Sequence, residues 1–378
     1  MTETTPAQPQ TQPQPQNTTA QLKRGVVKQV LSGDAIVLRG PPVNGPPKEM
    51  TVYLSNVSAP RLAKRPTDNS EGTPDEPYAW ESREFLRKKV VGKEVTFFRD
   101  FTATSGREHG RIYLGDSENA ENVTESSVAE GWVEVRQGTK GTDEYTQKLN
   151  ELQEAAKASK KGKWGPEEEA KNHIRDIKWT IDNPRNFVDS LKQKPQKAVI
   201  EQVRDGATVR ALLLPDFHYI TLVMSGVKAP MVRTGAEGKV VEADPYGEEA
   251  RFYTESRILQ RDVEVVLESV SNQNFVGSIV HPNGNIAEML LRDGFAKCVD
   301  WSIALASCGT EVYRTAERYA KEHKLRLWKT YQPSAALSGD KKSFQAKVME
   351  IVMGDALVIK KDSGEVMKIW LSSIRPPK

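Results

Sequence analysis

The sequence has few of the features that mark secreted, disulfide-stabilised or membrane-spanning proteins. Its 378 residues contain only two cysteines, Cys298 and Cys308, so a disulfide scaffold is excluded and reduced thiols are expected. No run of about 18 apolar residues is present. The N-terminus has neither a basic start nor an apolar stretch, which excludes a secretory signal. We therefore predict a cytoplasmic protein, with the nucleus as a further compartment.

An excess of one charge sign is also lacking. The chain has 54 basic and 51 acidic side chains, so any surface for nucleic acid must be local rather than general. Metal and nucleophile motifs are missing too, because the histidines are scattered without the spacing of zinc ligands and no G-x-S-x-G or phosphate-loop sequence occurs. The histidines, read as surface or packing residues, are His109, His173, His218, His281 and His323.

What the sequence does contain is an internal repeat. VVKQVLSGDAIVL begins at Val26, VIEQVRDGATVRA at Val199 and KVMEIVMGDALVI at Lys347. Each block alternates apolar and polar residues on both sides of a glycine, which predicts two strands around a tight turn. The turn glycines are Gly33, Gly206 and Gly354.

Further matches follow in the same order along the first two copies. VSAP at Val57 matches VKAP at Val227, and a helical segment from Tyr78 matches another from Tyr246. Each complete copy then reads as three strands, a helix, two strands, a short helix and a closing helix that ends in tryptophan. We expect an α+β, mainly β protein of tandem five-stranded OB-type barrels with helices packed on them.

The composition and the repeat together set the expected boundaries. A Gln- and Pro-rich leader is expected to be disordered, and the last copy stops after its first strands. The expected segments are a leader at 1–21, a first repeat at 22–166, a polar linker at 167–195 that is partly ordered around 174–179, a second repeat at 196–330, a linker at 331–343, and the truncated start of a third repeat at 344–378.

The order of a G-D-[AT] turn, a V-x-x-P segment, a G-R strand and a closing helix with tryptophan resembles the staphylococcal nuclease domain. Tandem copies behind a Gln/Pro-rich leader are similar to the N-terminal part of the Tudor staphylococcal nuclease family. The resemblance implies an association with RNA-induced silencing complexes, with decay of microRNA and edited double-stranded RNA, and with transcriptional coactivation.

The resemblance also locates catalytic positions, most of which hold other residues. In the first copy, Asp34 keeps one calcium aspartate and Arg111 one phosphate arginine, whereas Ser58, Arg61 and Tyr53 replace a second aspartate, the glutamate base and the other arginine. The matching residues in the second copy are Ala207, Lys228, Ala229, Met231, Val223 and Ser278, and the third copy has Asp355, Arg375, Trp370 and Lys378. Calcium needs six to eight oxygen ligands, so we expect no metal site and only vestigial catalytic residues.

Basic residues gather at the closing helices, which makes these the candidate RNA-binding surface. Acidic residues are interspersed among them, so an ordinary solvated helix face is the alternative interpretation. The candidate residues are Lys157, Lys160, Lys161, Lys163, Arg314, Arg318, Lys321, Lys324 and Arg326.

Our first hypothesis is therefore an RNA-binding scaffold for double-stranded or structured RNA, with silencing-complex proteins as partners implied by the resemblance. A weak calcium-dependent endoribonuclease, carried by Asp34 and Arg111, is the second hypothesis. A protein-binding platform or transcriptional coactivator without a direct role in RNA binding is the third.

Overall fold

The computed structural model describes residues 23–42, 46–117, 119–136, 143–235, 240–332 and 344–371. The chain divides into two compact units, Met1–Lys329 and Thr330–Lys378. The expected leader, most of the second linker and the predicted positions Arg375 and Lys378 lie outside the described residues. No helix within the described ranges is long and apolar enough to cross a membrane.

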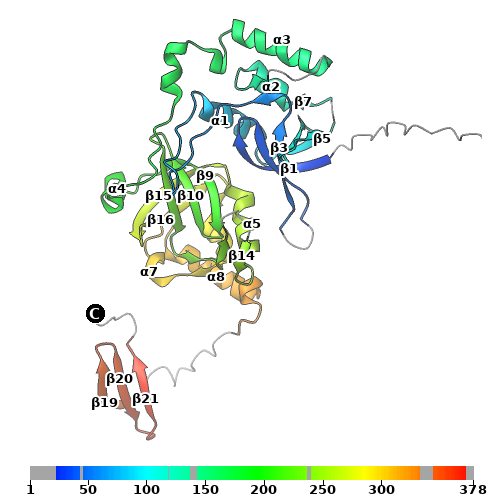
Figure 1. Ribbon diagram of the computed structural model, residues 1–378. Coiled ribbons are helices and arrows are strands. Elements are labelled where there is room, and N and C mark those ends of the chain that lie inside the picture. Colours follow the sequence, from blue (N-terminus) through cyan, green and yellow to red (C-terminus); the bar gives the residue numbers. More distant parts are fainter. Residues whose placement is uncertain are drawn as a thin grey trace, which may run out of the picture. The chain divides into compact units, whose positions relative to one another are not determined.

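The first repeat is a closed barrel. Strands β1, β2, β3, β5 and β6 follow one another in the order β3-β2-β1-β5-β6, and a parallel pairing of β3 with β6 closes the sheet (Figure 1). The elements are β1 (Lys23–Ser32), β2 (Ala35–Arg39), β3 (Glu49–Leu54), β4 (Val57–Ser58), α1 (Ala79–Val90), β5 (Glu94–Thr102), β6 (Glu108–Leu114), β7 (Glu121–Asn122), α2 (Val123–Ala129), β8 (Glu134–Val135) and α3 (Glu144–Ala158).

The second repeat has the same topology, with the sheet order β11-β10-β9-β15-β16 and a parallel closure between β11 and β16. Its elements are β9 (Gln196–Asp205), β10 (Thr208–Leu213), β11 (His218–Met224), β12 (Val227–Lys228), β13 (Val232–Thr234), β14 (Val240–Ala243), α5 (Gly247–Ile258), β15 (Asp262–Ser271), β16 (Asn274–His281), β17 (Gly284–Asn285), α6 (Ile286–Arg292), β18 (Lys297–Cys298), α7 (Asp300–Ile303) and α8 (Thr310–Glu322). The predicted tandem five-stranded barrels are confirmed.

Each barrel has its own apolar core, built from the inward-facing residues of the strands and one side of the helices. The turn glycines lie where the first helix of each repeat packs against the β1–β2 or β9–β10 hairpin. A Cβ atom on Gly33 would lie 1.9 Å from the Ser82 hydroxyl, and one on Gly206 would lie 2.9 Å from the Cβ atoms of Ala229 and Ala250. Glycine is therefore required by close packing at these turns.

The closing helices end earlier than the sequence suggested. They stop at Ala158 and Glu322, and the tryptophans Trp164 and Trp328 belong to separate 3-10 turns, η1 (Gly162–Trp164) and η3 (Arg326–Trp328). The reason is a left-handed backbone after each helix, at Lys160 and at Lys324, which no α-helix can continue.

The segment expected to be a polar linker is structured over much of its length. It contains η2 (Glu167–His173) and α4 (Pro184–Leu191). Val188 of α4 is buried in the core of the second repeat. The backbone of Lys178 exchanges hydrogen bonds with Phe217 and Tyr219 at the start of β11. The segment between the repeats thus packs against the second barrel.

The second unit is a three-stranded antiparallel sheet of β19 (Ala346–Met353), β20 (Ala356–Lys361) and β21 (Val366–Trp370). These are the strands predicted for the start of a third copy. Its apolar side chains are largely exposed, with Ile351 at 73% and Trp370 at 58%, because this small sheet has little of its own to pack against.

Candidate nucleic-acid interface

The first barrel keeps the aspartate of the nuclease-type turn but surrounds it with protein partners. Asp34 lies between β1 and β2, where its carboxylate accepts a 2.5 Å hydrogen bond from the Ser32 hydroxyl. The guanidinium of Arg136 lies 3.9 Å from the other carboxylate oxygen. Asp34 therefore has the short-range partners of a turn aspartate.

The retained arginine of this barrel is held by a carboxylate. Arg111 on β6 pairs with Asp100, with nitrogen–oxygen distances of 3.0 and 2.9 Å. Its guanidinium also lies 4.2 Å from the centre of the Phe98 ring and 5.2 Å from that of Tyr145. A phosphate would have to displace Asp100 to reach this cation.

The remaining positions of the first site hold neutral or cationic groups. Ser58 pairs with Glu134 in the short β4–β8 ladder, and the Arg61 guanidinium binds Glu76 at 2.7 Å. The hydrogen bond from the Arg61 backbone is the largest cause that lowers the pKa of Glu76. Neither Ser58 nor Arg61 supplies a carboxylate for an ion or a base for water.

A buried histidine, which the sequence analysis classed with the packing residues, lies beside this site. His109 on β6 is 4% exposed and its ring stacks on Phe101, with 4.7 Å between centroids, and lies 5.5 Å from Tyr53. Burial, with the nearby charge of Arg136, lowers the pKa of His109. Its Nδ1 atom is buried without a hydrogen-bond partner in the described residues. The ring is thus kept neutral among aromatic neighbours.

In the second barrel a carboxylate stands at the position that matches Asp100. Both residues lie at the bulge where β5 or β15 shifts register against its neighbour. Glu268 accepts hydrogen bonds from the hydroxyls of Ser225 and Ser278, the latter at 2.8 Å, and from the backbone N–H of Ser307 at 2.8 Å. The position of the phosphate arginine is therefore occupied by a hydroxyl that binds an anion of the protein itself.

The basic residues predicted on α3 are mostly paired with nearby glutamates. Lys157 binds Glu154 at 2.8 Å, and the ammonium groups of Lys157 and Lys163 both lie 4.9 Å from the centre of the Trp164 ring. Lys161 binds Glu130 at 2.9 Å and Lys163 binds Glu134 at 2.7 Å. Lys160 is exposed, and no ion pair to it is found in the described part of the chain.

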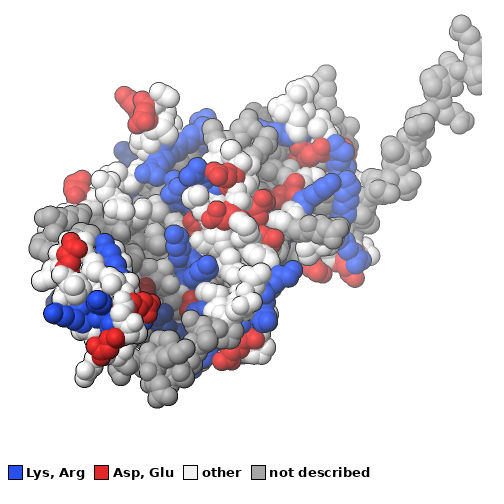
Figure 2. All heavy atoms as spheres, turned by 90° about the horizontal axis from the view of Figure 1, so that it is seen from below, with Lys and Arg blue, Asp and Glu red and all other residues white. Residues whose placement is uncertain are grey.

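Helix α8 and the turn after it show the same mixture. Arg314 pairs with Asp300, and Lys321 binds the buried Glu317 at 2.8 Å. Arg326 donates to the backbone carbonyl of Asp293 at 2.5 Å. Arg318 and Lys324 are exposed, and within the described ranges neither has a carboxylate partner. Figure 2 shows basic and acidic side chains interspersed on the face it presents, without a continuous field of one sign.

Comparison with known proteins decides the family. A model of staphylococcal nuclease homologues matches residues 51–166 and 221–330, one match in each barrel. The chain belongs to the staphylococcal nuclease family.

The chain matches longer relatives over nearly all of its own length. The chain is 51% identical over 358 residues to staphylococcal nuclease domain-containing protein 1 of Drosophila melanogaster, covering 94% of this chain and 38% of the relative. Ribonuclease TUDOR 2 of Arabidopsis thaliana is 34% identical, and the match covers 95% of this chain and 42% of that relative. Staphylococcal nuclease domain-containing protein 1 of Schizosaccharomyces pombe is 33% identical, and the match covers 87% of this chain and 38% of that relative. The chain thus spans about two fifths of these relatives.

Calcium-dependent hydrolysis in this family, as the resemblance implies, needs carboxylates that hold the ion. Among the described residues, no group of three or more His, Cys, Asp or Glu side chains is placed to bind a metal ion. Around Asp34 the neighbouring groups are a serine hydroxyl and an arginine, which offer too little negative charge for calcium. The donor set of the first staphylococcal nuclease site does not fit the ion.

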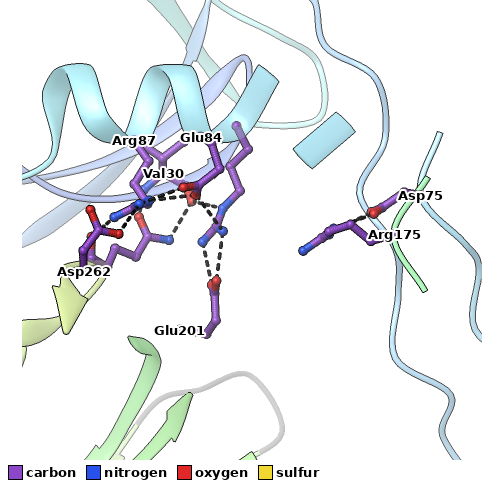
Figure 3. Close-up of polar contacts among 9 residues, drawn as sticks. Val30, Asp75, Glu84, Arg87, Arg175, Glu201 and Asp262 are labelled. Carbon is purple, nitrogen blue, oxygen red and sulfur yellow. Dashed lines mark hydrogen bonds and ion pairs between the residues drawn. The ribbon is translucent and has the colours of Figure 1, made fainter. Parts of the chain in front are cut away.

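The two staphylococcal nuclease barrels are joined by buried polar contacts that the sequence analysis did not predict. Arg83 of α1 forms a two-point contact with Glu201 of β9, at 2.9 and 2.5 Å. Arg87 of α1 reaches Asp262 at 2.7 Å and the backbone carbonyl of Gln260 at 2.7 Å (Figure 3). The only sequence signal was a pair of arginines on a helix face that also carries core residues.

Gln260 completes this junction. Its side-chain amide accepts from the N–H of Val30 at 2.6 Å and donates to the carbonyl of Val30 at 2.8 Å, so it bonds to both polar groups of one residue in the first barrel. Gln260 is 3% exposed and adopts a left-handed backbone. These contacts fix the two barrels as one unit.

Proposed function

We propose that this part of the protein binds RNA as a scaffold and that neither described barrel hydrolyses it. The observation that carries the proposal is the pairing of the former catalytic positions with the protein itself. Asp100 neutralises Arg111 in the first barrel, and hydroxyls surround Glu268 in the second. The relatives named ribonuclease support RNA as the nucleic acid.

The surface proposed for RNA consists of those cations at the closing helices that have no carboxylate partner in the described residues. They include Lys160, Arg318, Lys324 and Arg326, of which Arg326 donates to a backbone carbonyl. Cations without such partners attract phosphate without first breaking an ion pair, and binding of this kind weakens steeply with salt. Structured or double-stranded RNA is the proposed ligand, because the two barrels form one compact unit that would hold these cations at a fixed spacing.

Fluorescence anisotropy with a labelled RNA hairpin tests the proposal. We expect affinity to fall as potassium chloride rises from 50 to about 200 mM, and to fall further in Arg318→Glu/Lys324→Glu. Lys192→Glu/Lys194→Glu is the matched control, because these exposed lysines at the end of α4 undergo the same change of charge. Affinity that does not respond to salt would contradict phosphate-tracking binding.

A second candidate, weak calcium-dependent cleavage, is favoured by the relatives named ribonuclease TUDOR. In the first barrel it would depend on Asp34 and Arg111. Incubating inosine-containing duplex RNA with the protein, in calcium or in chelator, separates the candidates. Cleavage that requires calcium and disappears in Asp34→Ala would replace the scaffold by an enzyme.

We further propose that the protein acts within RNA silencing complexes, a proposal supported by the family resemblance alone. A protein-binding platform without RNA contact is the competing role. Two results together would favour the platform. Silencing-complex proteins would co-purify with the chain even after ribonuclease treatment, and the chain would show no RNA affinity at 50 mM salt.

A further inference from the structure

A cavity of about 430 Å³ lies at the junction of the two barrels, apart from both nuclease-type sites. Its volume is within the range of small-ligand pockets, roughly 300–1,000 Å³. Its walls come from β1, from the loop before α1, from the segment that connects the repeats, and from strands β9 to β11. The lining residues used below are Arg65, Arg83, Arg175, Glu201, Arg210, Trp179 and Tyr219.

The charges of the cavity are unbalanced. Arg83 is neutralised by Glu201, and Arg175 binds the buried Asp75 at 2.6 and 2.9 Å. Figure 3 shows the Asp75–Arg175 pair standing to one side of Glu201. Among the ion pairs of the described residues, none involves Arg65 or Arg210, which also line the cavity. Two positive charges therefore remain there for an anion.

Arg210 has an unmet hydrogen-bonding group. One of its terminal nitrogens donates to the amide oxygen of Gln202 at 3.1 Å, whereas its Nε–H is buried without a partner in the described residues. A buried donor left unpaired is costly, and such groups are expected at places where a ligand completes the bonding.

Aromatic rings stand beside these cations. The centroids of Trp179 and Tyr219 are 5.2 Å apart with the rings tilted by 59°, so their faces are not stacked on each other. The guanidinium of Arg65 lies 6.0 Å from the centre of the Tyr219 ring. Aromatic faces next to arginines are the combination that binds unpaired bases together with their phosphates.

We propose that this cavity binds one unpaired nucleotide of an RNA, with the base against Trp179 or Tyr219 and a phosphate at Arg65 and Arg210. The inference rests on the proposed RNA-binding function and names a site at which one nucleotide of the RNA would bind. The aromatic and apolar walls favour a nucleotide over a phosphorylated peptide, for which the arginines alone would suffice. Arg83, Arg175 and Gln260 hold the walls in place, so little ordering is required on binding.

The first test measures binding of a labelled 12-nucleotide oligouridine by anisotropy. We expect Trp179→Ala to weaken binding about tenfold and Trp179→Phe to restore most of it, because phenylalanine keeps a stacking face. Arg65→Ala/Arg210→Ala should weaken binding and reduce the salt slope by about 0.7 for one lost phosphate contact. The controls are Trp301→Ala, at a tryptophan that is 55% exposed, and Arg204→Ala, at an exposed arginine of β9.

The outcomes separate this inference from the proposed function. If RNA binds but Trp179→Ala and Arg65→Ala/Arg210→Ala match the controls, the nucleotide cavity is refuted while the scaffold remains. If the wild-type chain binds neither oligouridine nor hairpin, the scaffold fails as well. Tighter binding of a phosphorylated peptide than of oligouridine, lost in Arg65→Ala/Arg210→Ala, would assign the cavity to a protein partner.

Cross-linking of the unaltered chain removes any dependence on the folding of variants. Oligouridine that carries 4-thiouridine should cross-link to peptides that contain Trp179 or Tyr219. Cross-links confined to α3 and α8 would overturn the proposal.

Discussion

At the scale of single residues, positions that the family resemblance assigns to a nuclease site are paired with groups of the protein itself. Asp100 and Glu268 occupy the same bulge position in the two barrels. Asp100 pairs with Arg111, and Glu268 accepts a hydrogen bond from Ser278. In each barrel, the residue that the resemblance places at the phosphate-arginine position therefore contacts a carboxylate of the protein. A polar pocket that would be costly to leave unpaired has thereby been satisfied within the fold.

His109 gives a prediction for the dependence of stability on pH. Burial and Arg136 lower its pKa, with Arg107 acting in the same direction and with Asp34 and Asp100 opposing them. The unfolded chain binds a proton near pH 6.5 that the native state does not yet bind. The contribution of His109 is therefore fully present above pH 6.5 and is lost as the pH falls below it.

Between pH 7 and pH 5, we expect the free energy of unfolding to decrease less in His109→Phe than in the wild type. Urea denaturation at both pH values measures this, and the difference is limited to about 1.4 kcal/mol for each unit of pKa shift. His323→Phe, at an exposed histidine next to Tyr319, is the control. Equal loss of stability in wild type and His109→Phe would show that this ring does not contribute.

At the scale of secondary-structure elements, each hairpin turn packs closely against the helix that covers it. Gly33 leaves no room for a side chain, because Ser82 and Ala59 lie against it. We expect Gly33→Ala to lower the free energy of unfolding by about 1–3 kcal/mol through overpacking. Gly40→Ala, where the nearest atom would be 3.9 Å away, should change it little.

A double variant isolates the cause. Ser82→Ala removes the hydroxyl that lies 1.9 Å from the added methyl group. Gly33→Ala/Ser82→Ala should therefore lose less stability than the sum of the two single variants. Additive losses would mean that the contacts with the Cβ atoms of Ala59 and Ser82, both at 3.0 Å, and not the contact with the hydroxyl, set the effect.

The barrel strands and the helices shared by the two repeats could be predicted from the sequence because their local patterns occur twice, whereas α4, α7, β13 and β14 occur once and were not predicted. Alternation gave the strands, and Asn122 and Asn285 cap the short helices as a helix start requires. The ends of α3 and α8 could not be predicted, because left-handed residues such as Lys160 and Lys324 carry no composition signal. The positions that match catalytic residues came from the family resemblance, whereas the partner of Arg111 depends on the bulge in β5, which no local pattern contains.

At the scale of the whole molecule, the junction between the barrels depends on long-range partners that no local pattern contains. A comparison of the repeats nevertheless offers one clue. Gly92 follows the first helix of repeat 1 with a left-handed backbone, and the matching residue of repeat 2 is Gln260, also left-handed. A side chain in that conformation costs roughly 1 kcal/mol, and the cost is offset by its paired hydrogen bonds to Val30.

Gln260→Gly therefore separates the backbone cost from the contact, because glycine relieves the strain while it removes the amide. We expect a net loss, since the N–H and the carbonyl of Val30 lose their bonds to the amide in a buried place. Combined with Arg87→Ala, which removes the contact to Asp262, the change should uncouple the barrels. Calorimetry of the full chain should then resolve separate transitions for the two barrels where wild type shows one.

The matched control is Arg233→Ala. It breaks a surface pair with Glu242, and the two side chains are 64% and 61% exposed, so the pair is expected to contribute little to stability.

Coupling of the barrels matters for function as well as for stability, because the nucleotide cavity is lined by residues of both barrels. Uncoupling should therefore weaken oligouridine binding while the salt-dependent binding of a hairpin to the closing helices persists. A single shared transition in Gln260→Gly/Arg87→Ala would show that the contacts left intact still couple the barrels, namely the Arg83–Glu201 pair and the segment between the repeats, where Arg175 binds Asp75.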